Sequence, residues 1–184
     1  MDFEYTTQRL QLNVLNEDCA ERVLRFYSSG RSAFEPVEPP KAVNFYTLEF
    51  QAATLKSEFH AFLNGGYMRY FWSLKNRPEL VIGTASFSNI IRGAYHTCQL
   101  GYKLLPEFQK RGYALEAVSR LVTAVFEDEH IHRIEAYCLP GNIGSISLLT
   151  RLGFEFECTA RSVILLRDGY TDHNRYVMIN PRDL

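Results

Sequence analysis

The chain has 184 residues, of which 46% are apolar and 22% charged, so we expect residues 1–184 to form one globular domain. The net charge of −1 argues against a direct nucleic-acid partner, because proteins that bind phosphate backbones are usually basic. No apolar run is long enough to span a membrane, and the residues after Met1 are acidic where a secretory signal would be basic.

The cysteines and histidines show no metal-ligand spacing. Four cysteines lie far apart in the sequence without a CxxC pair, and His130 and His132 have no third ligand nearby. Scattered cysteines of this kind are typical of buried thiols in a reducing compartment. We therefore expect a cytoplasmic protein with no metal site and no membrane association.

The first part of the chain predicts one strand and two helices. Apolar residues alternate over residues 9–15, which indicates a strand. Residues 16–30 predict a helix that Asn16 caps and Gly30 ends. After a proline-rich loop, apolar residues at helical spacing predict a second helix that runs through residues 44–66 and is stopped by Gly65 and Gly66.

The rest of the chain predicts an antiparallel meander followed by a strand–helix–strand unit. Six further strands are expected over residues 67–76, 79–89, 96–105, 132–139, 154–166 and 173–180. Helices are expected from Gly112 to Asp128 and within residues 140–153. The pattern predicts an α/β (α+β) fold with about seven strands, partly parallel and partly antiparallel.

The segment PEFQKRGYALEA, residues 106–117, has the composition of an anion site at a helix start. The first N–H groups of a helix have no intrahelical partner, and the helix dipole makes that end positive. Gly112 allows a close backbone approach or a positive φ, and Lys110 and Arg111 add charge. A helix start with two solvated cations explains the same residues and stays an alternative.

Two motifs resemble those of the GNAT superfamily of acetyl-CoA-dependent N-acyltransferases. The first is Q-x-x-G-x-A, formed here by Gln109, Gly112 and Ala114. The second is N-x-x-S…L-x-x-x-G-F, formed here by Asn142, Ser145, Leu149, Gly153 and Phe154. Upstream segments such as FEPVEPP and NFYTLEF resemble the branch of ribosomal-protein-alanine N-acetyltransferases, so the resemblance covers nearly the whole chain.

The resemblance implies a three-layer fold, in which helices cover both faces of a mixed sheet that splays into a V. Acetyl-CoA as co-substrate would lie in this V, with its pyrophosphate on the N–H groups of the loop after Leu104. The cofactor-binding residues that the resemblance implies are Leu104, Gln109, Lys110, Arg111, Gly112, Tyr113, Ala114, Leu115, Asn142 and Ser145.

The catalytic positions depart from the common family pattern. Tyr137 stands where many members have a glutamate base, and Leu149 stands where many have a tyrosine acid. Ser145 matches the serine that some members of the branch are thought to use as general acid, with helix capping as the alternative. Glu35 and Glu38, in the proline-rich loop, are further candidates for proton transfer, with solvated loop carboxylates as the alternative.

The acceptor that these positions favour is an N-terminal α-amine. At pH 7 about a tenth of an α-amine is neutral, against about 0.04% of a lysine side chain, a gap of about 3.5 kcal/mol. A site without a strong base therefore suits a protein N-terminus, such as that of a ribosomal protein, and the enzyme is expected to be a monomer or a homodimer. A small-molecule amine acetyltransferase and a non-catalytic acyl-CoA sensor are the alternative functions.

Overall fold

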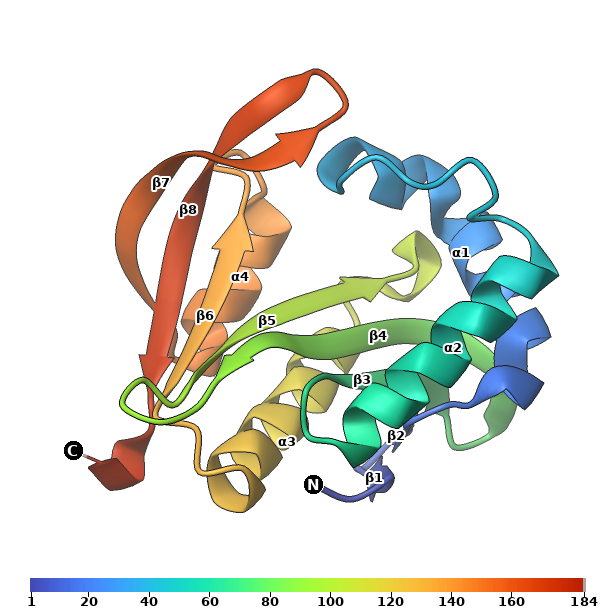
Figure 1. Cartoon of the computed structure of the whole chain (residues 1–184), viewed down its shortest axis with the longest axis horizontal. Coiled ribbons are helices and arrows are strands. Elements are labelled where there is room, and N and C mark those ends of the chain that lie inside the picture. Colours follow the sequence, from blue (N-terminus) through green and yellow to red (C-terminus); the bar gives the residue numbers. More distant parts are fainter. Residues whose placement is uncertain (184) are drawn as a thin grey trace.

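One eight-stranded sheet forms the frame of the computed structural model, which describes residues 1–183 (Figure 1). Its strands are β1 (Glu4–Thr6), β2 (Leu10–Asn13), β3 (Met68–Leu74), β4 (Arg77–Ile91), β5 (Thr97–Leu104), β6 (Arg133–Cys138), β7 (Glu155–Leu166) and β8 (Gly169–Ile179). Their order across the sheet is β1-β2-β3-β4-β5-β6-β8-β7. Among the strands of residues 1–183, only β5 and β6 pair in parallel, which confirms the mixed sheet expected from the sequence.

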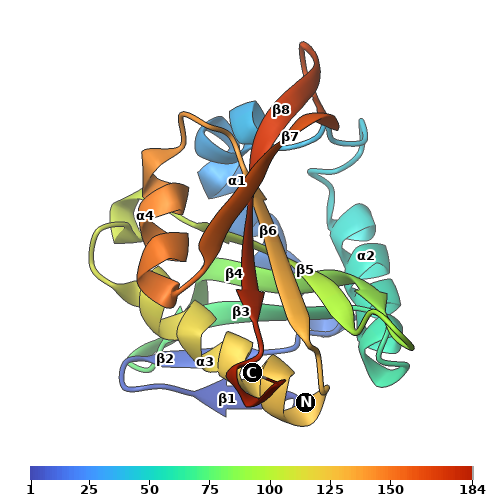
Figure 2. The same cartoon turned by 90° about the vertical axis from the view of Figure 1, so that its left-hand side faces the viewer.

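In the described part of the chain, four α-helices cover the two faces of this sheet. They are α1 (Ala20–Phe34), α2 (Leu48–Leu63), α3 (Tyr113–Asp128) and α4 (Ile143–Leu152). Helices α1 and α2 lie on one face, and α3 and α4 lie side by side on the other, so the three-layer arrangement is confirmed (Figures 1 and 2). Short 3-10 turns occupy Glu17–Cys19, Glu35–Val37, Pro106–Phe108 and Pro181–Asp183.

Burial explains why the central strands read as apolar runs. In β3, five of the seven residues from Met68 to Leu74 are buried, because helices cover both sides of the sheet there. Strand β6 alternates instead: Ile134, Ala136 and Cys138 are buried, and the residues between them are partly exposed. None of the helices in residues 1–183 combines the length and the apolar character that a membrane crossing requires.

The sheet opens between its two parallel strands. β5 and β6 pair only from Thr97 opposite Arg133 to Leu100 opposite Ala136. Beyond that point β5 stays paired with β4 as far as Leu104, and β6 stays paired with β8. The two strands therefore diverge like the arms of a V, as Figure 1 shows.

Several sequence-based expectations for the first half of the chain are wrong. β1 was not expected, because three residues are too few for an alternating pattern to stand out. Asn16 makes no capping hydrogen bond through its side chain. The second helix begins at Leu48, where the Thr47 hydroxyl accepts a hydrogen bond from the Phe50 N–H at 3.2 Å.

The predicted helix end at Gly30 is also wrong, because α1 continues to Phe34. A Cβ atom at Gly30 would lie 2.0 Å from the Phe34 ring, so glycine is needed there for close packing. The ammonium group of Lys103, on β5, lies 5.6 Å from the centroid of the same ring. Gly30 therefore helps to shape the surface of the sheet near the opening.

We expect Gly30→Ala to destabilise the protein by about 1–3 kcal/mol through overpacking, which exceeds the helix-propensity gain of about 1 kcal/mol. Urea denaturation measures this. Gly144→Ala is the matched control, because that glycine is also helical, is exposed and has its nearest side-chain atom 3.7 Å from the added methyl. A Gly30→Ala variant as stable as the parent would show that Phe34 moves aside at no cost.

Candidate functional site

The turn between β5 and α3 has an unusual backbone. Lys110 and Gly112 both adopt a positive φ, of 59° and 82° respectively. The Gln109 side chain donates from Nε2 to the carbonyl oxygen of Leu104 at 3.2 Å, which ties the turn to the end of β5. A non-glycine residue in the left-handed region costs about 1–2 kcal/mol, so Lys110 is held there by its surroundings.

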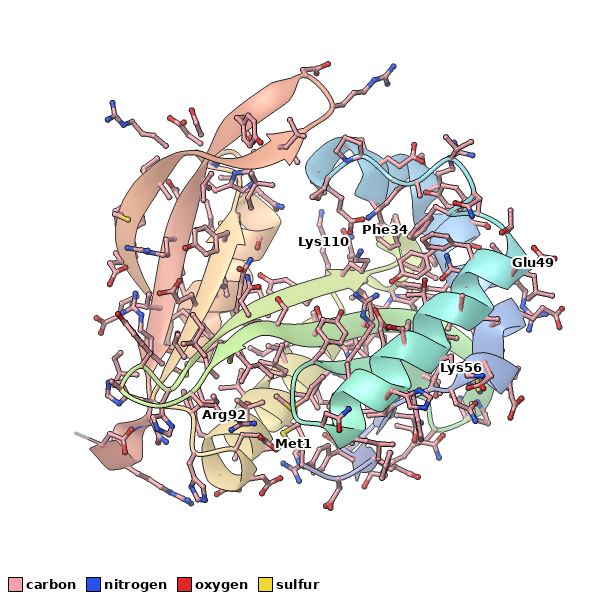
Figure 3. The ribbon with its side chains drawn as sticks, viewed as in Figure 1. Met1, Phe34, Glu49, Lys56, Arg92 and Lys110 are labelled. Atoms are coloured by element: carbon pink, nitrogen blue, oxygen red, sulfur yellow. The ribbon has the colours of Figure 1, made fainter. Side chains whose placement is uncertain are left out.

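The start of α3 is open. Gly112 is its N-cap and supplies no side-chain hydrogen bond, so the first N–H groups, from Tyr113 to Leu115, face outward without a capping partner. Lys110 and Arg111 are exposed beside them (Lys110 is labelled in Figure 3). Outward N–H groups, the positive end of the helix dipole and two cations together favour an anion.

The start of α4 contributes a second polar cluster. The Asn142 side chain caps this helix, because its Oδ1 accepts from the Ser145 N–H at 3.1 Å. The Ser145 hydroxyl is not used for capping. It lies 2.6 Å from the phenol oxygen of Tyr102, close enough for a strong hydrogen bond.

Tyr102 is a site residue that the sequence reasoning missed. It lies on β5 beyond Leu100, where the pairing with β6 has already ended, so its contact with Ser145 spans the opening of the V. Burial raises the pKa of the Tyr102 phenol, which therefore keeps its proton at neutral pH. The sequence did contain a signal for this position. Side chains alternate between the two faces along β5, so Tyr102 lies on the same face as the buried Leu100 and Leu104, which is the α4 side of the sheet.

The three predicted catalytic residues do not share one face of the sheet. Ser145 lies on the α3–α4 face, where its hydroxyl meets Tyr102. Tyr137 alternates with the buried Ala136 and Cys138 along β6, so it projects to the opposite face, where its phenol donates to Glu135 Oε2 at 3.1 Å. Glu35 lies at the end of α1, also on that opposite face, and pairs with Arg31 at 3.0 Å.

Glu38 is a largely buried carboxylate on this opposite face. Lys41 Nζ lies 2.6 Å from its Oε2, and the Lys103 ammonium pairs with its Oε1. Burial alone would raise the pKa of Glu38, but the two lysines outweigh burial and hold that pKa below its usual value. Burial lowers the pKa of Lys103 to about 8.

A group of opposite charges lies beside Tyr137. Arg133 Nη2 lies 2.8 Å from Glu157 Oε2, and Arg175 Nε lies 2.7 Å from the same oxygen. Arg133 also pairs with Glu135 at 2.9 Å. The carboxylates next to Tyr137 are therefore neutralised by arginines, as Glu38 is neutralised by lysines.

Comparison with known proteins identifies the relatives of this chain. Residues 9–155 match the family model described as an acetyltransferase (GNAT) domain. The chain is 33% identical over 178 residues to the [ribosomal protein uS5]-alanine N-acetyltransferase of Escherichia coli strain K12, covering 96% of this chain and 90% of that protein.

Solved structures agree with this relationship. The ribosomal-protein-S5-alanine acetyltransferase of Vibrio fischeri superposes with a TM-score of 0.92 at 27% identity, covering 98% of both chains. A Mycobacterium smegmatis structure in complex with CoA-disulfide superposes with a TM-score of 0.90 at 18% identity, over 100% of this chain and 89% of that one, which shows a shared fold. The family match and the identity to the Escherichia coli enzyme together show that this chain belongs to the GNAT acetyltransferase family.

Proposed function

We propose that this chain, acting as one domain, transfers the acetyl group of acetyl-CoA to the N-terminal α-amine of a ribosomal protein. The observation that carries the proposal is the open start of α3 next to the divergence of β5 from β6. The 33% identity to an enzyme named for alanine N-acetylation of ribosomal protein uS5 supports the acceptor class.

The cofactor pyrophosphate would bind the N–H groups from Lys110 to Leu115, with Lys110 and Arg111 adding charge. The pantetheine arm would follow β5 from Gly101 to Leu104, whose backbone groups on that edge have no sheet partner. Extended amide-containing chains bind such edges through backbone hydrogen bonds. The thioester would then reach the pair formed by Tyr102 and Ser145.

We expect Gly112→Glu to abolish acetyl-CoA binding in calorimetric titration, because it places bulk and negative charge at the pyrophosphate site. Gly93→Glu is the matched control, since Gly93 also has a positive φ, of 74°, and lies in the turn between β4 and β5 with nothing within 4 Å of an added Cβ. Undiminished binding by a folded Gly112→Glu variant would contradict the pyrophosphate assignment.

The transfer requires two proton movements: the acceptor amine loses a proton, and the CoA thiolate gains one. The neutral amine attacks the thioester carbon, the C–S bond breaks, and the CoA thiolate accepts a proton. Ser145 is the proposed donor, because its hydroxyl is free of the helix cap and adjoins the protonated Tyr102 phenol. Tyr102 would return a proton to Ser145 and so act as a second catalytic group.

We expect Ser145→Ala to lower kcat by about 10–100-fold with little change in the KM for acetyl-CoA. This decrease in kcat lies at or below the lower end of the range that a single general acid or base contributes, about 100–10,000-fold. Tyr102→Phe should lower kcat in the same way, and the double variant should lose little more than the worse single variant, because the two groups act as one unit. Ser147→Ala, on the exposed face of the same helix, is the control. Unchanged kcat in Ser145→Ala would leave this residue with no chemical role.

The proton on the acceptor leaves without a strong protein base in this proposal. Glu38 is paired with Lys41 and Lys103, which lower its pKa and make it a weaker base. Glu35 is paired with Arg31. The Tyr137 hydroxyl donates a hydrogen bond to Glu135. The acceptor must therefore arrive with a substantial neutral fraction, which an α-amine has at neutral pH.

We expect kcat/KM to rise about tenfold per pH unit and to level off near the acceptor's own pKa, about 7.7–8.0 for an α-amine. Lys103, whose pKa of about 8 lies in the same range, could produce a similar rise of kcat/KM with pH. Two acceptor peptides distinguish the two origins. They are a peptide that begins with alanine and the same peptide beginning with 3-fluoroalanine, which is less basic. The rise of kcat/KM should shift to lower pH with the fluorinated peptide. Identical pH profiles for the two peptides would instead assign the rise to an enzyme group.

A further inference from the structure

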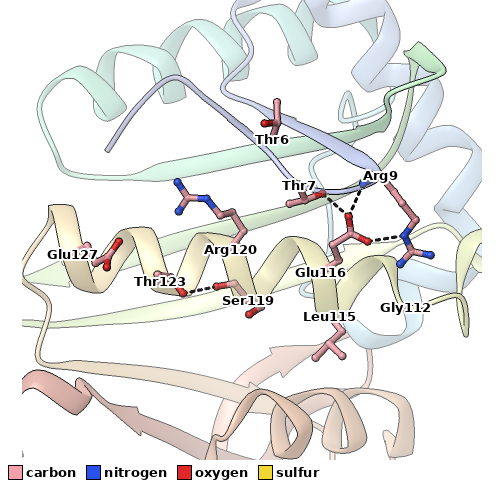
Figure 4. A pocket seen from close by; sticks show the side chains of 10 residues that line it. All are labelled: Thr6, Thr7, Arg9, Gly112, Leu115, Glu116, Ser119, Arg120, Thr123 and Glu127. Carbon is pink, nitrogen blue, oxygen red and sulfur yellow. Dashed lines mark hydrogen bonds and ion pairs between the residues drawn. The ribbon is translucent and has the colours of Figure 1, made fainter.

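The turn between β1 and β2 docks on the first turn of α3, beside a shallow cavity of about 730 Å³ (Figure 4). Both oxygens of Glu116 are bound there. Oε1 accepts from the Thr7 hydroxyl at 2.5 Å and from the Arg9 N–H at 2.7 Å. Oε2 accepts from Arg9 Nε at 2.6 Å.

Arg9 also reaches the turn that leads into α3. Its Nη1 donates to the carbonyl oxygen of Arg111 at 2.9 Å, although 102 positions separate the two residues. Its guanidinium carbon lies 4.4 Å from the centre of the Tyr113 ring. A Cβ atom at Gly112 would lie 3.2 Å from Arg9 Nη2. One side chain therefore contacts the residues on both sides of Gly112.

These contacts fix a backbone conformation that is costly by itself. Lys110 and Gly112 flank Arg111, and both adopt a positive φ. A turn with two left-handed residues opens readily unless its carbonyl and N–H groups are held. The bond from Arg9 to the Arg111 carbonyl holds the middle of this turn and leaves the N–H groups on its other side available.

Arg9 also neutralises a charge near the anion site. Glu116 is the acidic residue in the first turn of α3. Burial alone would raise its pKa, but hydrogen bonds from Thr7 and Arg9 hold that pKa below its usual value, so the carboxylate is charged at neutral pH. Without Arg9 this negative charge would repel an anion at the helix start.

We propose that Arg9 is a positioning residue for the co-substrate, which holds the Lys110–Gly112 turn in its anion-binding shape and cancels the charge of Glu116. The inference rests on the proposed pyrophosphate site. It adds a role for the first turn of the chain, which touches neither the V nor the pair of Tyr102 and Ser145.

The test is steady-state kinetics and calorimetric titration of Arg9→Ala with acetyl-CoA. We expect the KM and the dissociation constant to rise about 10–100-fold, the range expected for loss of a hydrogen-bonded charge, while kcat at saturation changes less than about threefold. Arg182→Ala is the control, because it breaks an ion pair with Glu127, at the opposite end of the same helix. A lowered Tm with unchanged KM would overturn the proposal.

A second variant tests the electrostatic part. Adding Glu116→Gln to Arg9→Ala removes the charge that Arg9 no longer cancels, so at least threefold of the lost affinity should return. No recovery would overturn that part of the proposal. Arg9→Lys should retain more affinity than Arg9→Ala, because it keeps the ion pair with Glu116 while losing the planar donor to Arg111.

Failure of this inference can be distinguished from failure of the proposed function. If Gly112→Glu binds acetyl-CoA normally, the pyrophosphate site itself is wrongly assigned, and the inference falls with it. If Gly112→Glu loses binding while Arg9→Ala binds like the parent, the site stands and only the role of Arg9 is rejected.

Discussion

Parallel pairing between β5 and β6 stops after Leu100 and Ala136, and the positions of the other site residues follow from that limit. Each strand beyond this point keeps its outer neighbour, so neither frays, and the sheet opens only along one line. Beyond Leu100 the edge of β5 that faces β6 has backbone N–H and carbonyl groups without a sheet partner, and such groups need another partner. In the proposed function, an extended, amide-containing co-substrate would take that place.

The opening also separates the chemistry into two sides. On the side of α3 and α4 lie the open helix start and the hydroxyl pair of Ser145 and Tyr102. On the side of α1 and α2 lie Glu38 with its two lysines, and Tyr137 beside Glu135. In the proposed function, co-substrate and acceptor would approach from opposite faces and meet in the gap, without competing for the same side chains.

Local rules predicted the part of the site that is local in sequence. The Gln109–Leu115 motif specifies its own turn, because Gly112 tolerates the positive φ and α3 begins immediately after it. The pairs that cross the fold were missed for the same physical reason. Tyr102 meets Ser145 only because β5 and β6 diverge, and Lys103 reaches Glu38 only because α1 packs on β4. Gly30 was wrongly predicted to end a helix, because the glycine is required there by close packing against Phe34 and not by a helix end.

The charge pattern on the α1–α2 face bears on the proposed choice of acceptor. The two carboxylates considered as bases, Glu35 and Glu38, are each paired with a cation, and Glu135 is engaged by Arg133 and by the Tyr137 phenol. A cationic lysine side chain would meet paired groups there and would still have to lose a proton with a pKa near 10.4. An α-amine loses its proton near neutral pH and needs only to be positioned. The ion pairs on that face therefore support the proposal of an N-terminus, and not a lysine side chain, as acceptor, through proton affinity and before any contact with the rest of the acceptor is made.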